Sequence, residues 1–280
     1  GEVLVGAVHA FVTATRPLVI GIPSYETPVA TAELLDLPVK SVPVDERLQL
    51  DLDAMAEAAV GAGLFYLCNP NNPTGAVLSD DSMSAIAQLT ERHGAWILSD
   101  EVYVGAESSS QETRSFWGSH DRVLITNSMS KAYGLPGLRL GWIVGPTDLV
   151  HELWGRTDYT TIAPASVSDM LACIALEPDT RARIIERTRG IVRANLGILE
   201  SWMAEQDGRF SYRRPDAGAI CYTRYDAPMG STEFAEKLRV EKDVLVVPGD
   251  HFGMDQYLRL GFGNPQDELV EGLDRIREAF

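Results

Sequence analysis

The 280-residue sequence has no long hydrophobic run and few basic residues. No stretch approaches the roughly 18 consecutive apolar residues of a transmembrane helix, so none is predicted. Only 24 Lys and Arg residues stand against 40 Asp and Glu residues, which gives a formal net charge of −16. An acidic surface repels phosphate backbones and anionic lipids. Nucleic-acid binding and peripheral membrane binding are therefore disfavoured as main functions.

Cysteine and histidine are also scarce. The three cysteines, Cys68, Cys173 and Cys221, are odd in number, widely spaced and outside any CxxC pattern. This usage is typical of a reducing cytoplasm and disfavours structural zinc, and the five histidines are scattered, so we expect no metal site. Hydrophobic residues make up 45% of the chain. That share is enough for a sizeable core and excludes a disordered chain.

Short apolar runs alternate with helical patterns through the first half of the chain. This alternation predicts a mostly parallel sheet with helices on both faces. Ser79 and Gly94 are the expected N-cap and C-terminal residue of one of these helices. The predicted strands are 18–23, 39–45, 63–69, 95–100, 122–128 and 139–145, and the predicted helices are 2–15, 27–37, 50–60 and 80–93.

The pattern changes after Pro146. It is almost entirely helical to about Gln206. The strand candidates after it surround one helix, 231–241, and comprise 210–214, 219–225, 244–248 and 257–262. A final helix is predicted after Pro265, with an apolar stripe at Leu269, Leu273, Ile276 and Phe280. The fold class is therefore α/β. We predict a large domain over residues 1–177, with its sheet sandwiched by helices, and a connecting helix with a small α+β domain over residues 178–280.

Polar segments follow several predicted strands. Ligands of open α/β sheets bind beyond the carboxyl ends of the strands, where NPNNPTG (69–75), DEVY (100–103) and SMSKAYGLPGLRLG (128–141) are expected. A fourth segment, YLRLGFG (257–263), belongs to the small domain and carries Arg259. These segments contain the candidate functional residues.

Lys131 and Asp100 are the strongest candidates for chemistry. A lysine amine condenses with carbonyl compounds, and burial lowers its pKa toward the range needed. A lone lysine beside a turn is usually a surface residue, but the long glycine-rich pattern around Lys131 favours a functional role. The Asp100 carboxylate can hold a protonated ring nitrogen, or it can cap the next turn. Glu101 is the weaker carboxylate candidate.

Three further side chains have both a functional and an ordinary interpretation. Asn72 can donate and accept hydrogen bonds in a ligand site, or it can belong to a plain Asn/Pro/Gly turn. Tyr103 can donate its phenol to an oxygen there, or it can be half-buried packing. Arg259 lies in an apolar strand pattern, where an unpaired guanidinium is costly to bury and a bound carboxylate would offset the cost. Alternatively, Arg259 faces solvent on an edge strand.

The four motifs, in this order, resemble the pyridoxal-phosphate-dependent aminotransferases of fold type I, the class I/II group that includes aspartate and histidinol-phosphate aminotransferases. The resemblance covers essentially the whole chain. It implies a fold type I transferase with pyridoxal 5′-phosphate as cofactor and with an amino acid and a 2-oxo acid as substrates. It also implies a cytoplasmic homodimer with active sites at the subunit interface.

The resemblance assigns a role to each matching position. Lys131 matches the lysine that binds the cofactor as a Schiff base and moves the α-proton, and Asp100 matches the aspartate that pairs with the pyridine nitrogen. Tyr103 and Asn72 match the partners of the phenolic oxygen. The remaining matches are Ser128 and Arg139 for the cofactor phosphate, with Ser130 as a further candidate, Tyr25 for stacking on the cofactor ring, and Arg259, together with Asn72, for the substrate.

The resemblance leaves the reaction open. Transamination is the leading hypothesis, and a lyase, decarboxylase or cyclase of specialised amino-acid metabolism uses the same constellation. The effector domain of a transcription regulator is a third alternative. Members of the family are longer, so we expect Gly1 to be an interior residue of a longer chain. The family's phosphate-binding turn is then expected at or just before Gly1, and a chain that began there would bind the cofactor weakly.

Overall fold

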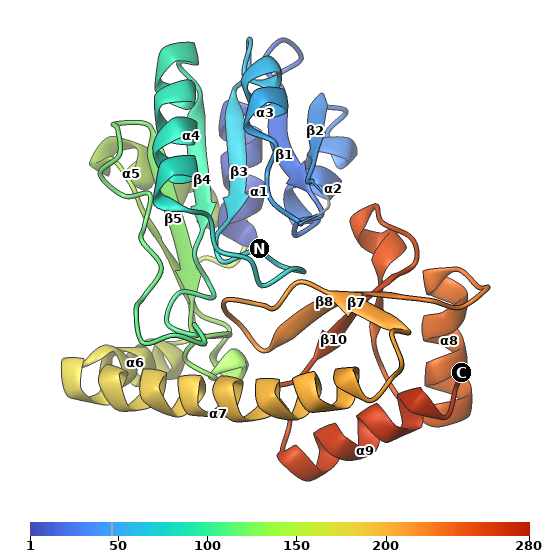
Figure 1. Ribbon diagram of the computed structural model, residues 1–280. Coiled ribbons are helices and arrows are strands. Elements are labelled where there is room, and N and C mark those ends of the chain that lie inside the picture. Colours follow the sequence, from blue (N-terminus) through green and yellow to red (C-terminus); the bar gives the residue numbers. More distant parts are fainter. Residues whose placement is uncertain (46) are drawn as a thin grey trace.

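Two β-sheets organise the structure, a computed structural model that describes residues 1–45 and 47–280 (Figure 1). The larger sheet has the strand order β2-β1-β3-β4-β5-β6, and every neighbouring pair is parallel except β5–β6. The mostly parallel sheet predicted from the sequence is confirmed. Its strands are β1 (Leu18–Ile22), β2 (Val39–Pro43), β3 (Leu64–Cys68), β4 (Trp96–Asp100), β5 (Val123–Ser128) and β6 (Gly141–Val144).

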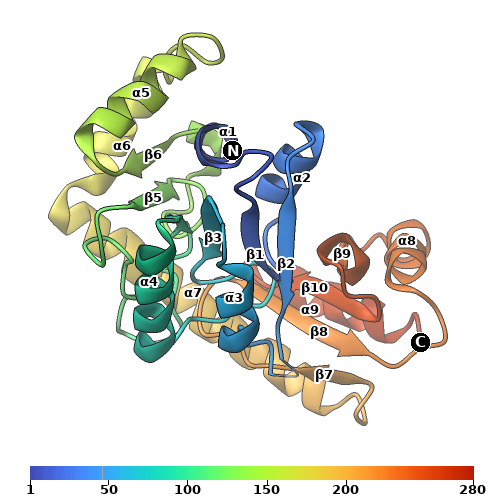
Figure 2. The same cartoon turned by 90° about the horizontal axis from the view of Figure 1, so that it is seen from above.

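Helices cover both faces of the large sheet (Figure 2). Phe65 and Ile97 face the side covered by α3 and α4, whereas Leu64 and Leu98 face the side covered by α1 and α2. Because successive strand residues point to opposite faces, strands covered on both sides are apolar throughout. The helices of this half of the chain are α1 (Glu2–Phe11), α2 (Thr27–Leu34), α3 (Leu52–Ala58), α4 (Asp80–His93), α5 (Thr147–Thr157) and α6 (Ser166–Leu176).

The second sheet is antiparallel and has the strand order β7-β8-β10-β9. The long helix α7 contributes Ile185 to a cluster with α6 and contributes Leu196 and Leu199 to the core of the small sheet, so it connects the two halves. The division at residue 177 stays a prediction. The elements are α7 (Pro178–Ala204), β7 (Phe210–Tyr212), β8 (Ile220–Tyr225), α8 (Ser231–Lys242), β9 (Val247–Pro248), β10 (Tyr257–Gly261) and α9 (Gln266–Arg277).

Helix α4 begins and ends where its sequence predicts. The Ser79 hydroxyl accepts a hydrogen bond of 3.1 Å from the backbone N–H of Ser82, which satisfies one of the free donors of the first turn. Gly94 follows the helix in the left-handed conformation, with a φ of 62°. The structure describes no helix that is both long and apolar enough to cross a membrane within 1–45 and 47–280.

Several boundaries differ from the sequence prediction. Helix α1 ends at Phe11 and not near residue 15, because Thr13 and Arg16 pair their backbone groups with each other in a turn. The last predicted strand before the 3-10 turn at Gly249 shrinks to β9, Val247–Pro248. Phe280 lies beyond α9 and is partly exposed, although its ring packs edge-on against Phe210 and Phe234.

A buried ion pair ties α7 to the large domain. The Arg189 guanidinium donates to the Glu107 carboxylate at 2.7 Å, and both side chains are at least nine-tenths buried. Glu107 also accepts hydrogen bonds from the backbone N–H groups of Gly105 and Thr113. Its backbone forms a bridge with Ala217, which belongs to the loop before β8. The pair therefore holds together the loop after β4, the long helix and the small domain.

We predict that Arg189→Met lowers the free energy of unfolding by about 3–5 kcal/mol, because Glu107 is left as a buried charge without its cation. Urea denaturation at pH 7.5 measures the change. Arg193→Met is the matched control, since Arg193 lies one turn further along α7 and its ion pair with Glu186 is exposed. The control is expected to change stability by no more than about 0.5 kcal/mol. Equal losses in the two variants would contradict this account of the buried pair.

Candidate active site

The carboxyl ends of β3, β4 and β5 lie at one edge of the large sheet, which faces the small sheet (Figure 1). Cys68 pairs in register with Asp100, and Asp100 with Thr126, so β3 and β4 end at the same level and β5 continues to Ser128. The three predicted segments 69–75, 100–103 and 128–141 follow these ends. The parallel topology thus brings together residues that are about 60 positions apart in sequence.

Asp100 is the buried carboxylate of the site. Only 4% of its surface is exposed. Its Oδ2 accepts a hydrogen bond of 3.1 Å from the Tyr66 hydroxyl, and its Oδ1 accepts one of 3.3 Å from the backbone N–H of Val102. Burial raises the pKa of Asp100 to about 6, and these two hydrogen bonds work against the increase. Within the described residues Asp100 forms no ion pair.

Lys131 and Tyr103 lie next to each other in the site. The Lys131 Nζ is 5.8 Å from the centroid of the Tyr103 ring. Lys131 as a whole is exposed, but its amine is partly desolvated, and desolvation lowers its pKa. The positive charge of Arg259 lowers it further. A lysine with a lowered pKa has more of the neutral amine that acts as a nucleophile or base. Burial raises the pKa of Tyr103, which keeps its phenol protonated.

Asn72 and Arg259 connect the parts of the chain that contain the two sheets. The Arg259 guanidinium donates a hydrogen bond of 2.9 Å to the Asn72 Oδ1, although 187 positions separate the two residues. Strand β10 is an inner strand of the small sheet, so the alternative of a solvent-facing arginine on an edge strand is wrong. Among the described residues Arg259 forms no ion pair with a carboxylate. It is therefore available to an anionic ligand.

The other predicted residues border this centre. Ser128 ends β5, and its Oγ accepts a hydrogen bond of 3.2 Å from the backbone N–H of Ser130. Arg139 is exposed in the left-handed conformation and donates to the Pro136 carbonyl, while its charge contributes to the lowered pKa of Lys131. Tyr25 is half-buried, and it is close enough to Tyr103 to affect the pKa of that phenol.

Glycine allows the small domain to approach the site loops closely. A Cβ on Gly75, which has a φ of 66°, would lie 2.5 Å from Cβ of Pro215 and 2.9 Å from the Ala217 carbonyl oxygen. A Cβ on Gly218 would lie 3.0 Å from the Tyr103 ring. Because these positions have no room for a side chain, the loop that carries Asn72 and the ring of Tyr103 pack directly against the segment before β8.

Two contacts of the site were missed by sequence reasoning. Tyr66 belongs to an apolar run that predicts only a buried strand, yet its hydroxyl donates to Asp100. Alternation along β3, together with the pairing of β3 with β4, is the signal that could have found it. Phe252 lies beside Arg259, with 5.6 Å between its ring centroid and the guanidinium carbon. Glu101, by contrast, turns away from the site and accepts hydrogen bonds from Ser99 and Ser115.

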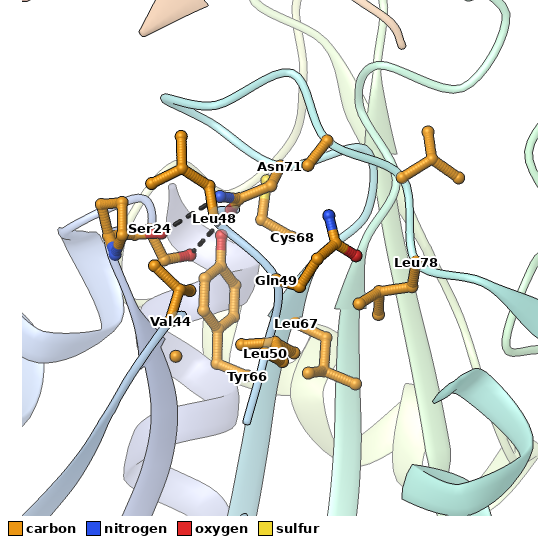
Figure 3. A pocket seen from close by; sticks show the side chains of 14 residues that line it. Ser24, Val44, Leu48, Gln49, Leu50, Tyr66, Leu67, Cys68, Asn71 and Leu78 are labelled. Atoms are coloured by element: carbon orange, nitrogen blue, oxygen red, sulfur yellow. Dashed lines mark hydrogen bonds between the residues drawn. The ribbon is translucent and has the colours of Figure 1, made fainter. Parts of the chain in front are cut away.

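A small cavity lies beside the site (Figure 3). Its lining includes Tyr66, Cys68 and Asn71, and the segment 48–50 closes one side. The cavity measures about 40 Å³. That volume holds one or a few water molecules, and it is far below the ~300 Å³ or more of a typical ligand site. It is therefore not the substrate site. No three His, Cys, Asp or Glu side chains among residues 1–45 and 47–280 form a group that could hold a metal ion.

The chain is similar in sequence to a family of known proteins. Residues 1–276 match the family model described as aminotransferase class I and II. The chain is 34% identical over 209 residues to a capreomycidine synthase from Streptomyces vinaceus, covering 75% of this chain and 53% of that protein. It is 30% identical over 259 residues to a histidinol-phosphate aminotransferase from Symbiobacterium thermophilum, covering 91% of this chain and 68% of that protein.

The fold of the chain is also similar to that of solved structures. A PLP-dependent aminotransferase from Streptococcus suis superposes with a TM-score of 0.91 at 29% sequence identity, covering 99% of this chain and 74% of that one. The chain thus spans about three quarters of that structure. It spans about half the length of the capreomycidine synthase and of an aspartate aminotransferase from Streptomyces avermitilis, to which it is 30% identical over 77% of its own length.

The raised pKa of Asp100 predicts how stability depends on pH. A carboxyl group whose pKa is higher in the folded state than in the unfolded state binds more protons when folded, so stability falls as pH rises through the window between the two values. Asp100→Asn removes this titration. We expect the variant without ligand to gain stability over the native protein by about 1 kcal/mol between pH 5 and pH 7.5, measured by urea denaturation. A constant difference across this window would contradict the buried, unpaired state of Asp100.

Proposed function

The chain belongs to the aminotransferase class I and II family, and from this premise we propose that it is an enzyme that uses pyridoxal 5′-phosphate to move an α-amino group between an amino acid and a 2-oxo acid. The observation that carries the proposal is the contact between Arg259 and Asn72. It places the Arg259 guanidinium, which pairs with no carboxylate in the part of the chain that the structure describes, close to Lys131. An amine, an unpaired buried carboxylate and an anion-binding guanidinium then share one site.

The side chains present fit the cofactor. Asp100 is a buried carboxylate without an ion-pair partner among residues 1–45 and 47–280, and the protonated pyridine nitrogen of pyridoxal phosphate would supply a cation. The Oδ1 of Asn72 is already used by Arg259, so its amide nitrogen remains a donor for the phenolic oxygen of the cofactor, together with Tyr103. Ser128 and Arg139 would hold the phosphate, and the Tyr25 ring would stack on the cofactor.

Each residue then contributes one physical effect to the reaction. The bound cofactor supplies an electron sink that stabilises negative charge at the α-carbon of the amino acid. Asp100 would pair with the pyridine nitrogen and keep it protonated, which would maintain this property. Lys131 would hold the cofactor through its amine. The same Nζ, whose pKa desolvation lowers, would be the base that takes the α-proton of the substrate. Arg259 holds the substrate carboxylate through two parallel N–H donors.

A second reaction on the same cofactor is favoured by one similarity. The capreomycidine synthase from Streptomyces vinaceus is 34% identical to this chain, which is more than the 30% of the aspartate and histidinol-phosphate aminotransferases. The alternative is therefore a lyase, decarboxylase or cyclase reaction on an amino acid. Which bond of the substrate is broken depends on how Arg259 and its neighbours orient the α-carbon over the cofactor ring, and the residues described above would serve either reaction.

We further propose that the protein acts as a homodimer in the cytoplasm. Helix α6 packs through Ala172 and Ala175 onto the large domain, and it leaves Val167, Met170 and Ile174 more than half exposed on its other face. These positions are spaced by three or four residues and form one apolar stripe. Such a stripe is typical of a protein–protein contact. The three cysteines are free thiols, which is compatible with a reducing compartment.

The transaminase proposal predicts two coupled half-reactions. We expect the protein loaded with pyridoxal phosphate to convert an added amino acid to its oxo acid, and then to aminate a different oxo acid, with visible absorbance and chromatography as readouts. Lys131→Ala is expected to reduce turnover by at least about 10³-fold, since it removes both the covalent attachment and the base. Arg259→Lys should raise KM for the amino acid more than it lowers kcat, because it loses the bidentate grip.

Two results would contradict these expectations. Pyruvate, ammonia or CO₂ as the product from the amino acid, with no amination of the oxo acid, would replace the transaminase proposal by the lyase or decarboxylase alternative. A Lys131→Ala variant with the turnover of the native protein would refute the role of Lys131.

The dimer proposal predicts that light scattering of the native protein gives twice the 30.6 kDa mass of the chain. Met170→Glu with Ile174→Glu is expected to give the monomer mass, because two charges would be buried in the contact. Val240→Glu, an equally exposed apolar position on α8, is the control and should remain a dimer. A monomeric native protein, or a dimer that survives the α6 substitutions, would reject this face as the interface.

A further inference from the structure

Tyr66 occupies a position that its strand pairing determines. In the β3–β4 register, Cys68 is opposite Asp100 and Tyr66 is opposite Leu98. Residues two apart point to the same face of the sheet, so Tyr66, Cys68, Leu98 and Asp100 all face the side covered by α1. Tyr66 is thus the diagonal neighbour of Asp100, a separation that a tyrosine side chain can span. Its hydroxyl donates to the Asp100 Oδ2 at 3.1 Å.

The surroundings of the Tyr66 hydroxyl favour its role as a hydrogen-bond donor to Asp100. Tyr66 is 1% exposed, and its hydrogen bond to Asp100 is the interaction that satisfies the buried hydroxyl as a donor. Burial and the neighbouring Asp100 both raise the pKa of Tyr66, so the phenol keeps its proton and remains a donor at any pH at which the protein works. The other oxygen of Asp100 accepts from the backbone N–H of Val102, which no side-chain substitution removes.

We propose that Tyr66 is a positioning residue that keeps the Asp100 carboxylate ionised and fixed in orientation, so that it can pair with the protonated ring nitrogen of the cofactor. This inference rests on the proposed function. Tyr66 does not touch the substrate or reacting atoms in this account. It acts through Asp100, whose Oδ2 accepts its hydrogen bond.

Several charges and titratable groups surround Asp100. Burial opposes the ionised carboxylate, whereas the Tyr66 hydroxyl, the backbone N–H of Val102 and the amine of Lys131 favour it. The Cys68 thiol and the Tyr103 phenol are close enough to sense the charge of Asp100, and burial raises the pKa of both, so they stay neutral. Tyr66→Phe removes the contribution of the hydroxyl to the ionisation of Asp100 and leaves the other contributions unchanged. Because hydrogen bonds to charged groups are strong, the pKa of Asp100 is expected to rise further in Tyr66→Phe.

The test is the affinity for pyridoxal phosphate of Tyr66→Phe relative to the native protein, measured by fluorescence titration from pH 6 to pH 8.5. The ratio of the two dissociation constants cancels the contributions of Lys131 and of the other groups that the substitution leaves unchanged. We expect the variant to bind about five-fold more weakly at pH 6, where its Asp100 is mostly protonated, and the deficit to shrink toward pH 8.5, where Asp100 is ionised in both proteins. A purely structural role would give a deficit that does not change with pH.

Tyr225→Phe is the matched control. Tyr225 is also a buried tyrosine whose hydroxyl donates a hydrogen bond, at 2.9 Å to the Met229 carbonyl, but it lies in the core of the small sheet. Its removal is expected to leave the affinity ratio at one across the whole pH range. A Tyr66→Phe variant with native affinity at pH 6, or with a deficit independent of pH, would overturn the inference while leaving the proposed function standing. A native protein that fails to bind pyridoxal phosphate would refute both.

Discussion

The Asp100 carboxylate is buried at the end of β4, and it accepts hydrogen bonds from a tyrosine hydroxyl and a backbone amide, not from a cation. A charge in such a place costs free energy, which appears as the raised pKa of the group. The rest of the site offsets part of this cost. Lys131 faces the carboxylate from the loop after β5, and Tyr66 supports it from β3. In the proposed function, a ring nitrogen of the cofactor supplies the missing cation.

The topology explains how these groups meet. Parallel pairing brings the ends of β3, β4 and β5 together. Asp100 ends β4, and the loops after β3 and β5 carry Asn72 and Lys131. The small sheet adds Arg259 from an inner strand, and the buried pair of Glu107 and Arg189 fixes the long helix that connects the two parts. Site geometry therefore depends on contacts between segments that are far apart in sequence.

Much of this was predictable from the sequence. The alternation of apolar runs predicts the large sheet, the Ser79 cap predicts the start of α4, and the motif residues Asn72, Asp100, Tyr103, Lys131 and Arg259 do lie around one centre. Their individual roles remain proposals. The contact between Tyr66 and Asp100 could not be predicted, because it depends on the pairing register of two strands and not on a local pattern. The early end of α1 was missed for a related reason, since it depends on a turn in which Thr13 and Arg16 satisfy each other's backbone groups.

The most direct measurement of the central claim is borohydride reduction of the protein loaded with pyridoxal phosphate, followed by peptide mass mapping. Reduction fixes the cofactor to the amine that carries it, and the sequence has only four lysines. The account predicts a single labelled peptide that contains Lys131, and no label in Lys131→Ala. A label distributed over Lys40, Lys237 and Lys242, or a label that persists in the Lys131→Ala variant, would contradict it.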